Sequence, residues 1–161
     1  MNDTLLNIKK LTRLALPTDD TYLYRLGIAL YGFSSINSFM TEIICHIDKV
    51  KDRSKLLDSG ASEILKIFRK TAENAKQEYP DIYDIMKKTG DLFEYINEQR
   101  TDFIHAYPIT NKKNEQILHR RKNSKSKYFE IDNIFLDKFI SKLHDISYGL
   151  YEIRKIVRQD L

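Results

Sequence analysis

A long apolar stripe is the feature that most constrains how this chain can fold. From about residue 19 to residue 48, apolar side chains recur every three or four positions, which is the spacing of one face of an α-helix. The stripe consists of Tyr24, Ile28, Tyr31, Ser35, Phe39, Ile43 and Ile47, with Leu30, Phe33, Ile36, Met40 and Ile44 beside it. A face this wide suits a helix at the centre of a bundle. Thr18 is expected to cap the helix, and Gly27 and Gly32 inside it indicate close backbone packing.

The same helical spacing recurs along most of the chain between short polar breaks. The predicted helices cover about residues 5–16, 19–48, 61–77, 80–90, 91–107 and 132–158. Gly90 is expected to end one helix, and Asp91 with Glu94 forms a capping box for the next. Gln116–Arg121 and Lys127–Ile131 flank a polar turn, which is typical of a hairpin. The sequence therefore predicts an all-α fold: a bundle of about five main helices with a small basic β-hairpin before the C-terminal helix.

Composition narrows the class of protein further. The 161 residues suit one domain with one core, and five Gly and three Pro are few for an all-β or linker-rich chain. The single cysteine, Cys45, allows no internal disulfide, which fits a reducing compartment. No apolar run approaches the ~20 residues of a membrane span, and no signal peptide is evident at the N-terminus. We therefore expect a cytoplasmic protein that does not contact a membrane.

Positive charge gathers in one segment although the net charge is only +4. Residues 111–127 contain Lys112, Lys113, Arg120, Arg121, Lys122, Lys125 and Lys127 against the single acid Glu115. Such a patch can contact the phosphates of RNA, and His119, Arg120, Arg121 and Lys122 are the candidate contacts. It can equally be a solvated loop whose charges keep the surface hydrated, and both interpretations stay open.

Arg100 stands at an apolar position in the predicted helix that ends near residue 107. It continues the series Phe93, Ile96, Arg100, Phe103, whose spacing is that of one helix face. A guanidinium group cannot lose its proton and is costly to bury alone. Arg100 must therefore find a carboxylate, a cluster of backbone groups, a phosphate or an interface. His105 follows about 140° further around an ideal helix, so the two side chains converge only if the helix ends between them or a second copy lies alongside.

Arg100, His105 and Tyr107 form the pattern Arg-x4-His-x-Tyr, which resembles the motif of HEPN domains. The form with tyrosine is similar to that of HEPN toxins paired with minimal nucleotidyltransferase antitoxins. Thr101 follows the arginine, where the family often has Asn, Asp or His, and Asp102 comes next. The resemblance implies a single HEPN-like helical domain over residues 1–161. It also implies a homodimer whose interface forms the cleft of a metal-independent endoribonuclease, acting as a toxin or phage-defence effector.

The resemblance also implies roles for the residues of this segment. His105 would be the general acid or base, and Arg100 would bind the scissile phosphate. Tyr107 would be a supporting residue or the one that the antitoxin nucleotidylates, with Thr101 and Asp102 in support. RNA carries its own nucleophile, the 2′-hydroxyl, so neither a metal nor another cofactor is expected. The alternative is a non-catalytic module for RNA or nucleotide binding, or for regulatory dimerisation, in which Arg100 makes an ion pair or a dimer contact.

Overall fold

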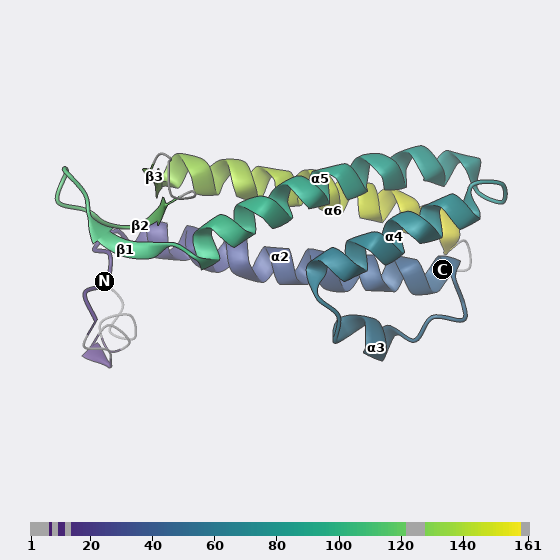
Figure 1. The fold of residues 1–161 in the computed structure, drawn as a ribbon, viewed down its shortest axis with the longest axis horizontal. Coiled ribbons are helices and arrows are strands. Elements are labelled where there is room, and N and C mark those ends of the chain that lie inside the picture. The colour runs from purple at the N-terminus through teal and green to yellow at the C-terminus, as the bar shows by residue number, and fades with distance from the viewer. Residues whose placement is uncertain (1–6, 8–9, 12–13, 122–127, 159–161) are drawn as a thin grey trace.

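The structure is a computed structural model, and it describes residues 7, 10–11, 14–121 and 128–158. The helices described are α2 (Asp20–Ile47), α3 (Arg53–Leu57), α4 (Ala61–Ala75), α5 (Pro80–Ile104) and α6 (Asn133–Val157). The strands are β1 (Tyr107–Thr110), β2 (Gln116–Arg121) and β3 (Tyr128–Ile131). The predicted helical bundle with a small β element before the last helix is confirmed. The sheet lies at the end of the bundle where α2 begins (Figure 1).

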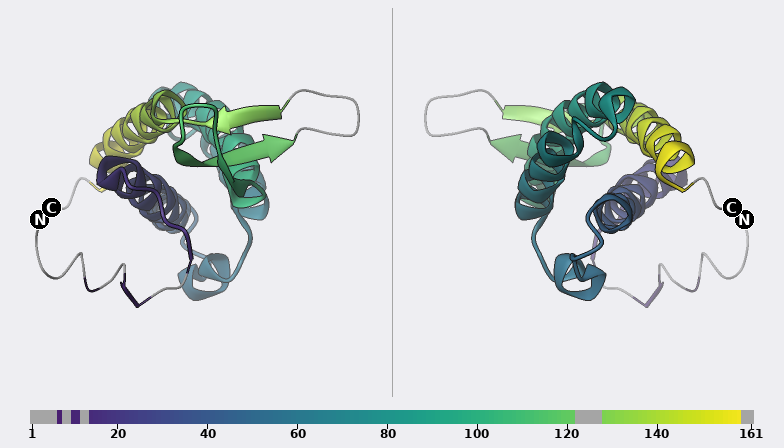
Figure 2. Two further views of the ribbon diagram at one scale, coloured as in Figure 1. Left: turned by 90° about the vertical axis from the view of Figure 1, so that its left-hand side faces the viewer. Right: turned by 90° about the vertical axis from the view of Figure 1, so that its right-hand side faces the viewer.

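The core lies between the long helices α2, α4, α5 and α6, whose arrangement can be followed in the end-on views (Figure 2). Helix α2 packs against α6 and α4, and α5 packs against the same two helices from the other side. Helices α3 and α4 accompany only the half of α2 that is far from the sheet (Figure 1). The half of α2 near the sheet is not accompanied by α3 and α4, and the C-terminal turns of α5 lie beside it (Figure 1).

Aromatic side chains form much of the interior. Phe33 of α2 stacks on Phe93 of α5 with ring centroids 5.4 Å apart, and Phe103 of α5 meets Phe139 of α6 edge-on at 5.1 Å. All four rings are almost fully buried. Burying such a side chain stabilises the fold by about 1.5–3 kcal/mol before the entropy of ordering it is counted. These contacts fix α5 against both α2 and α6.

Helix α2 has the length and the apolar composition of a membrane-spanning helix. Among the residues that the structure describes, no other helix meets these two criteria. This finding differs from the expectation that no segment reaches that length. In the structure the buried face of α2 packs into the bundle through residues such as Phe33, Met40 and Ile44. The core helix of a bundle meets the same criterion.

Helix α5 is continuous, so the predicted break at Gly90 is wrong. A Cβ atom at Gly90 would lie 3.6 Å from both the Leu65 and the Arg69 side chains, an ordinary van der Waals distance, so the helix passes this residue in contact with α4. The expected capping residues have another role: the Arg69 guanidinium reaches the carboxylates of Asp91 and Glu94, each at 2.8 Å. Helix α5 keeps these contacts with α4 and is continuous through Gly90, although a helical glycine costs ~1 kcal/mol.

The structure shows which residues cap the N-termini of α2 and α6. The cap of α2 is Asp19 rather than Thr18, and its carboxylate accepts a hydrogen bond from the backbone N–H of Thr21 at 2.9 Å. Asp132 caps α6 as predicted, accepting from the N–H of Phe135 at 2.8 Å. Of the predicted helix over residues 5–16, residues 5, 6, 8, 9, 12 and 13 lie outside the described residues, and residues 14–16 are not helical. Helix α3 was not predicted, because a helix of 5 residues leaves no periodic pattern in a polar segment.

The predicted hairpin is part of a sheet of three antiparallel strands in the order β1-β2-β3. Strand β1 was not predicted, because Pro108 argues against a strand; proline is tolerated here since β1 is an edge strand. The Tyr22 hydroxyl joins the sheet to α2. It accepts a hydrogen bond from the N–H of Leu118 and donates one to the carbonyl of Ile131, both at 2.9 Å. The sheet is therefore held directly against the start of α2.

Candidate functional site

The C-terminal turns of α5 carry the Arg-x4-His-x-Tyr segment. The helix ends at Ile104, His105 caps it, and Tyr107 begins β1. The backbone N–H of His105 still donates to the carbonyl of Thr101 at 3.1 Å, so the helical hydrogen-bond pattern reaches His105. The side chains of Arg100 and His105 therefore keep the directions of a helix and leave it on different sides.

Arg100 lies against the aromatic core rather than against a carboxylate. Its guanidinium carbon is 5.2 Å from the centroid of the Phe33 ring, a cation–π contact, and the residue is partly buried. Of the residues that the structure describes, none accepts a hydrogen bond from this guanidinium group. An aromatic ring satisfies the charge but not the N–H donors. A partly buried arginine with unoccupied donors suits an anionic ligand.

His105 is exposed at the end of α5. Its backbone carbonyl accepts a hydrogen bond from Nη1 of Arg120 on β2 at 3.4 Å, which ties the end of the helix to the sheet. The imidazole is therefore accessible to a ligand from the solvent side.

Asp102 and Arg120 form the ionic contact beneath this turn. Nε of Arg120 lies 3.4 Å from Oδ1 of Asp102, and the two side chains are 26% and 11% exposed. Arg120 was a candidate RNA contact, and in the structure it binds protein groups of α5. The hydroxyl of Thr101 donates to the carbonyl of Asn97 at 3.0 Å. Thr101, Asp102 and Arg120 thus contribute to the local structure that presents Arg100 and His105.

Tyr107 and His119 are neighbours across β1 and β2. The Tyr107 oxygen lies 3.3 Å from Nδ1 of His119, and their rings meet edge-on with centroids 5.5 Å apart. The sequence placed His119 in the basic hairpin but not beside the motif, since that neighbour depends on the unpredicted strand β1. Arg121 is exposed at the end of β2. Lys122, the remaining candidate RNA contact, lies outside the described residues.

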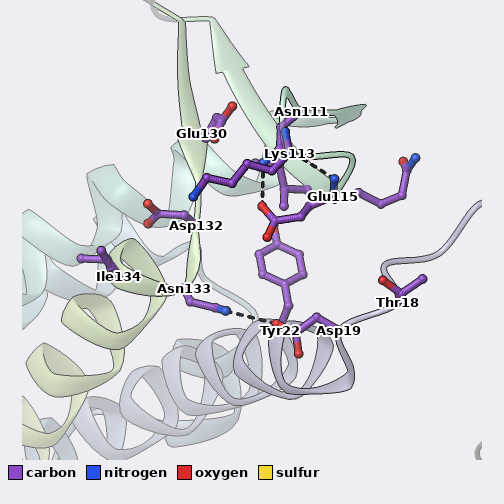
Figure 3. A pocket seen from close by; sticks show the side chains of 12 residues that line it. Thr18, Asp19, Tyr22, Asn111, Lys113, Glu115, Glu130, Asp132, Asn133 and Ile134 are labelled. Atoms are coloured by element: carbon purple, nitrogen blue, oxygen red, sulfur yellow. Dashed lines mark hydrogen bonds between the residues drawn. The ribbon is translucent and has the colours of Figure 1, made fainter.

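A polar pocket of about 420 Å³ opens beside the sheet (Figure 3). The carboxylates that line it are those of Asp19, Glu115, Glu130 and Asp132. Hydrogen bonds from Thr21 and Asn133 lower the pKa of Asp19, so that carboxylate is charged at neutral pH. An acidic wall of this kind repels the phosphates of a nucleic acid. Neither Arg100 nor His105 lines this pocket, and we do not assign it the chemistry of the motif.

A second pocket of about 420 Å³ lies between residues 14–17, the start of α2, and strands β1 and β2. Its lining is mostly aliphatic and includes Leu16, Leu26 and Ile117. No residue that lines it within the described part of the chain carries a formal charge at neutral pH, and neither Arg100 nor His105 reaches it.

Among residues 7, 10–11, 14–121 and 128–158, no group of three or more His, Cys, Asp or Glu side chains is placed to hold a metal ion. Comparisons with protein-family models, with curated proteins and with solved structures find no match for this chain. The function must therefore be argued from the residues of the candidate site, with Arg100 and His105 at its centre.

Proposed function

We propose that this chain is a metal-independent endoribonuclease of the HEPN type that acts as a cytoplasmic homodimer. The observation that carries the proposal is Arg100: its guanidinium is partly buried over Phe33 and has no acceptor among the described residues. A phosphate is the ligand that a planar guanidinium binds best, through two parallel N–H···O bonds. The exposed imidazole of His105 at the end of the same helix supports the proposal.

The proposed reaction uses the nucleophile that RNA itself contains. The 2′-oxygen attacks the adjacent phosphorus while the bond from phosphorus to the 5′-oxygen breaks, which yields a 2′,3′-cyclic phosphate and a 5′-hydroxyl. His105 transfers a proton in this step, and Arg100 stabilises the charge that develops on the phosphoryl oxygens. Acid–base catalysis of this kind contributes about 10²–10⁴-fold to a rate.

Two copies of the chain are part of the proposal, because Arg100 and His105 leave α5 in different directions. A second copy beside the first can bring its own His105 to the phosphate that Arg100 holds. The site then consists of one Arg100 and one His105 from different copies. The basic segment that includes Arg121 would extend the contact along the RNA backbone.

A toxin or phage-defence effector is the role we propose for this nuclease, with a nucleotidyltransferase antitoxin as partner. The support is Tyr107, which is 44% exposed and is the third residue of the motif. A nucleotide attached there would place a bulky anion beside His105. Co-expression with a nucleotidyltransferase encoded by a neighbouring gene, followed by mass spectrometry, tests this partner. Modification must appear on Tyr107 and be lost in Tyr107→Phe.

Cleavage of RNA in the presence of EDTA tests the proposed activity. The wild type is compared with Arg100→Ala and His105→Ala, and with His144→Ala, which alters an exposed histidine on α6. We expect cleavage by the wild type and by His144→Ala, and a loss of about 10²-fold or more in the other two. A folded wild type that cleaves no RNA contradicts the proposed function.

The alternative is a non-catalytic module that binds RNA or a nucleotide, or that dimerises to regulate a partner. The ion pair between Asp102 and Arg120 favours it, because a basic residue engaged by the protein is not available to a scissile phosphate. This alternative predicts that the wild type binds labelled RNA without cleaving it. Arg100→Ala would then weaken binding, measured by fluorescence anisotropy, while His105→Ala would not.

A further inference from the structure

His119 is the histidine that the fold brings to the motif. The chain has four histidines. His46 lies on α2, 3.4 Å from Glu42, and His144 is exposed on α6. His119 comes from β2, on which no part of the motif lies, yet its ring contacts Tyr107.

The sheet places three side chains in a row on one face. Tyr107 is the neighbour of His119 on β1, and Glu130 is its neighbour on β3. Residues opposite one another in antiparallel strands have Cβ atoms about 4.5–5.5 Å apart, so both flank the imidazole. Arg121, two positions along β2, lies on the same face. Among the described residues, Tyr107, Glu130 and Arg121 are thus ionisable neighbours of His119 on this face.

The backbone of β2 is also tied to the backbone of His105. Arg120, next to His119, donates from Nη1 to the carbonyl of His105 at 3.4 Å. Tyr107 is two residues from His105 and directly opposite His119. Standard backbone spacings therefore keep the Cα atoms of His105 and His119 within about 13 Å of each other. Two imidazoles on such backbones can reach the two sides of one phosphodiester.

We infer that His119 is a second proton-transfer residue, and the inference rests on the proposed nuclease function. Cleavage requires a base for the 2′-hydroxyl and an acid for the departing 5′-oxygen. His105 takes the proton of the 2′-hydroxyl as the bond from the 2′-oxygen to phosphorus forms. The His119 imidazolium gives its Nε2 proton to the 5′-oxygen as the bond from phosphorus to that oxygen breaks. Exchange of one proton with water at each histidine then restores the starting state.

Tyr107 has a positioning role in this inference. The imidazolium donates its Nδ1–H to the Tyr107 oxygen, so the proton given to the 5′-oxygen is the one on Nε2. The Glu130 residue lies opposite His119 on the other side, on β3. Glu130 also lines the polar pocket at the edge of this face (Figure 3). The row therefore runs from the motif to the acidic wall, with His119 between them.

The test measures cleavage of RNA in EDTA against pH for the wild type, His119→Asn, His119→Ala and the control His144→Asn. Asparagine can still hydrogen-bond to Tyr107 but cannot transfer a proton. We expect kcat to fall about 10²-fold or more in His119→Asn at an unchanged melting temperature. The decline of the rate at alkaline pH, which reports the acid, should disappear. Added imidazole should restore part of the cleavage by His119→Ala.

The outcomes separate this inference from the proposed function. If His119→Asn cleaves as fast as the wild type with the same pH profile, the inference fails and the nuclease stands. His119→Asn could instead lose activity while its rate still falls at both acid and alkaline pH, and imidazole could fail to rescue His119→Ala. That result shows a structural role for His119 and also overturns the inference. If the folded wild type cleaves no RNA, both proposals fall.

Discussion

At the scale of single residues, the ion pair between Asp102 and Arg120 joins the end of α5 to the sheet. Asp102 is buried, and removing the cation leaves a buried carboxylate without that partner. We expect Arg120→Met to lower the free energy of unfolding by about 1–3 kcal/mol in urea denaturation. The matched control is Lys112→Met, which alters an exposed residue and should change it by less than about 0.5 kcal/mol. Equal effects of the two substitutions would contradict this role.

Tyr22 makes the free energy of unfolding depend on pH in the alkaline range. Burial raises the pKa of its hydroxyl above the ordinary value near 10. The folded state therefore holds this proton more tightly than the unfolded state does. The contribution of this hydroxyl to the free energy of unfolding is complete below pH ~10. It is lost as the pH rises through the raised pKa of the folded state.

Replacing Tyr22 tests this dependence. At pH 8, Tyr22→Phe should unfold at a lower urea concentration than the wild type, because the N–H of Leu118 and the carbonyl of Ile131 lose their partner. Above pH ~10 the difference should shrink, since only the wild type loses the contribution of this hydroxyl. A difference that stays constant from pH 8 to pH 11 would show that Tyr22 does not titrate with unfolding.

The contacts around the motif show what the sequence predicts at this scale and what it does not. The spacing of Arg100, His105 and Tyr107 singles out the segment without any coordinates. The contacts of Arg100 with Phe33 and of Asp102 with Arg120 join distant parts of the chain, and no local pattern encodes them. Only the position of Arg100 on an apolar face indicated that it must find a partner.

At the scale of elements, the helical glycines differ in whether a neighbouring helix leaves space for a side chain. Gly149 of α6 faces α5, and a Cβ atom there would overlap the hydroxyl of Thr89, a buried residue with a stiff branched side chain. We expect Gly149→Ala to destabilise the protein by about 1–3 kcal/mol in thermal or urea unfolding. The matched control is Gly27→Ala on α2, which meets nothing within 4 Å and should stabilise by about 0.5–1 kcal/mol. The reverse order of the two variants would refute this packing.

The helical glycines also explain where element prediction succeeded and failed. The close packing expected at Gly32 is confirmed, since a Cβ atom there would lie 2.8 Å from the Leu143 side chain, whereas that expected at Gly27 is wrong. At Gly90 the sequence contains a glycine followed by a capping box, and local chemistry alone favours a break. The helix instead continues through Gly90, in contact with Leu65 and Arg69 of α4. Helices α2, α4 and α6 were predicted nearly to their ends because their apolar faces are long and periodic.

At the scale of the whole molecule, the proposed composite site predicts complementation between two variants that are expected to be inactive. Arg100→Ala and His105→Ala, mixed under conditions that allow subunits to exchange, form heterodimers. One of the two sites then has an intact Arg100 from one copy and an intact His105 from the other. We expect cleavage to recover to about a quarter of the wild-type rate when random exchange is complete, because half of the dimers are mixed. Mixtures that stay inactive while light scattering shows exchange would contradict a shared site.

The abrupt change from helix to strand has a consequence for how this chain can vary. Ile104 ends α5 and Tyr107 begins β1, so two residues separate two different geometries. A residue inserted between Arg100 and His105 would rotate the imidazole by about 100°. A residue inserted between His105 and Tyr107 would move the tyrosine to the opposite face of the sheet and away from His119. The proposed site therefore requires both intervals in Arg-x4-His-x-Tyr to keep their lengths.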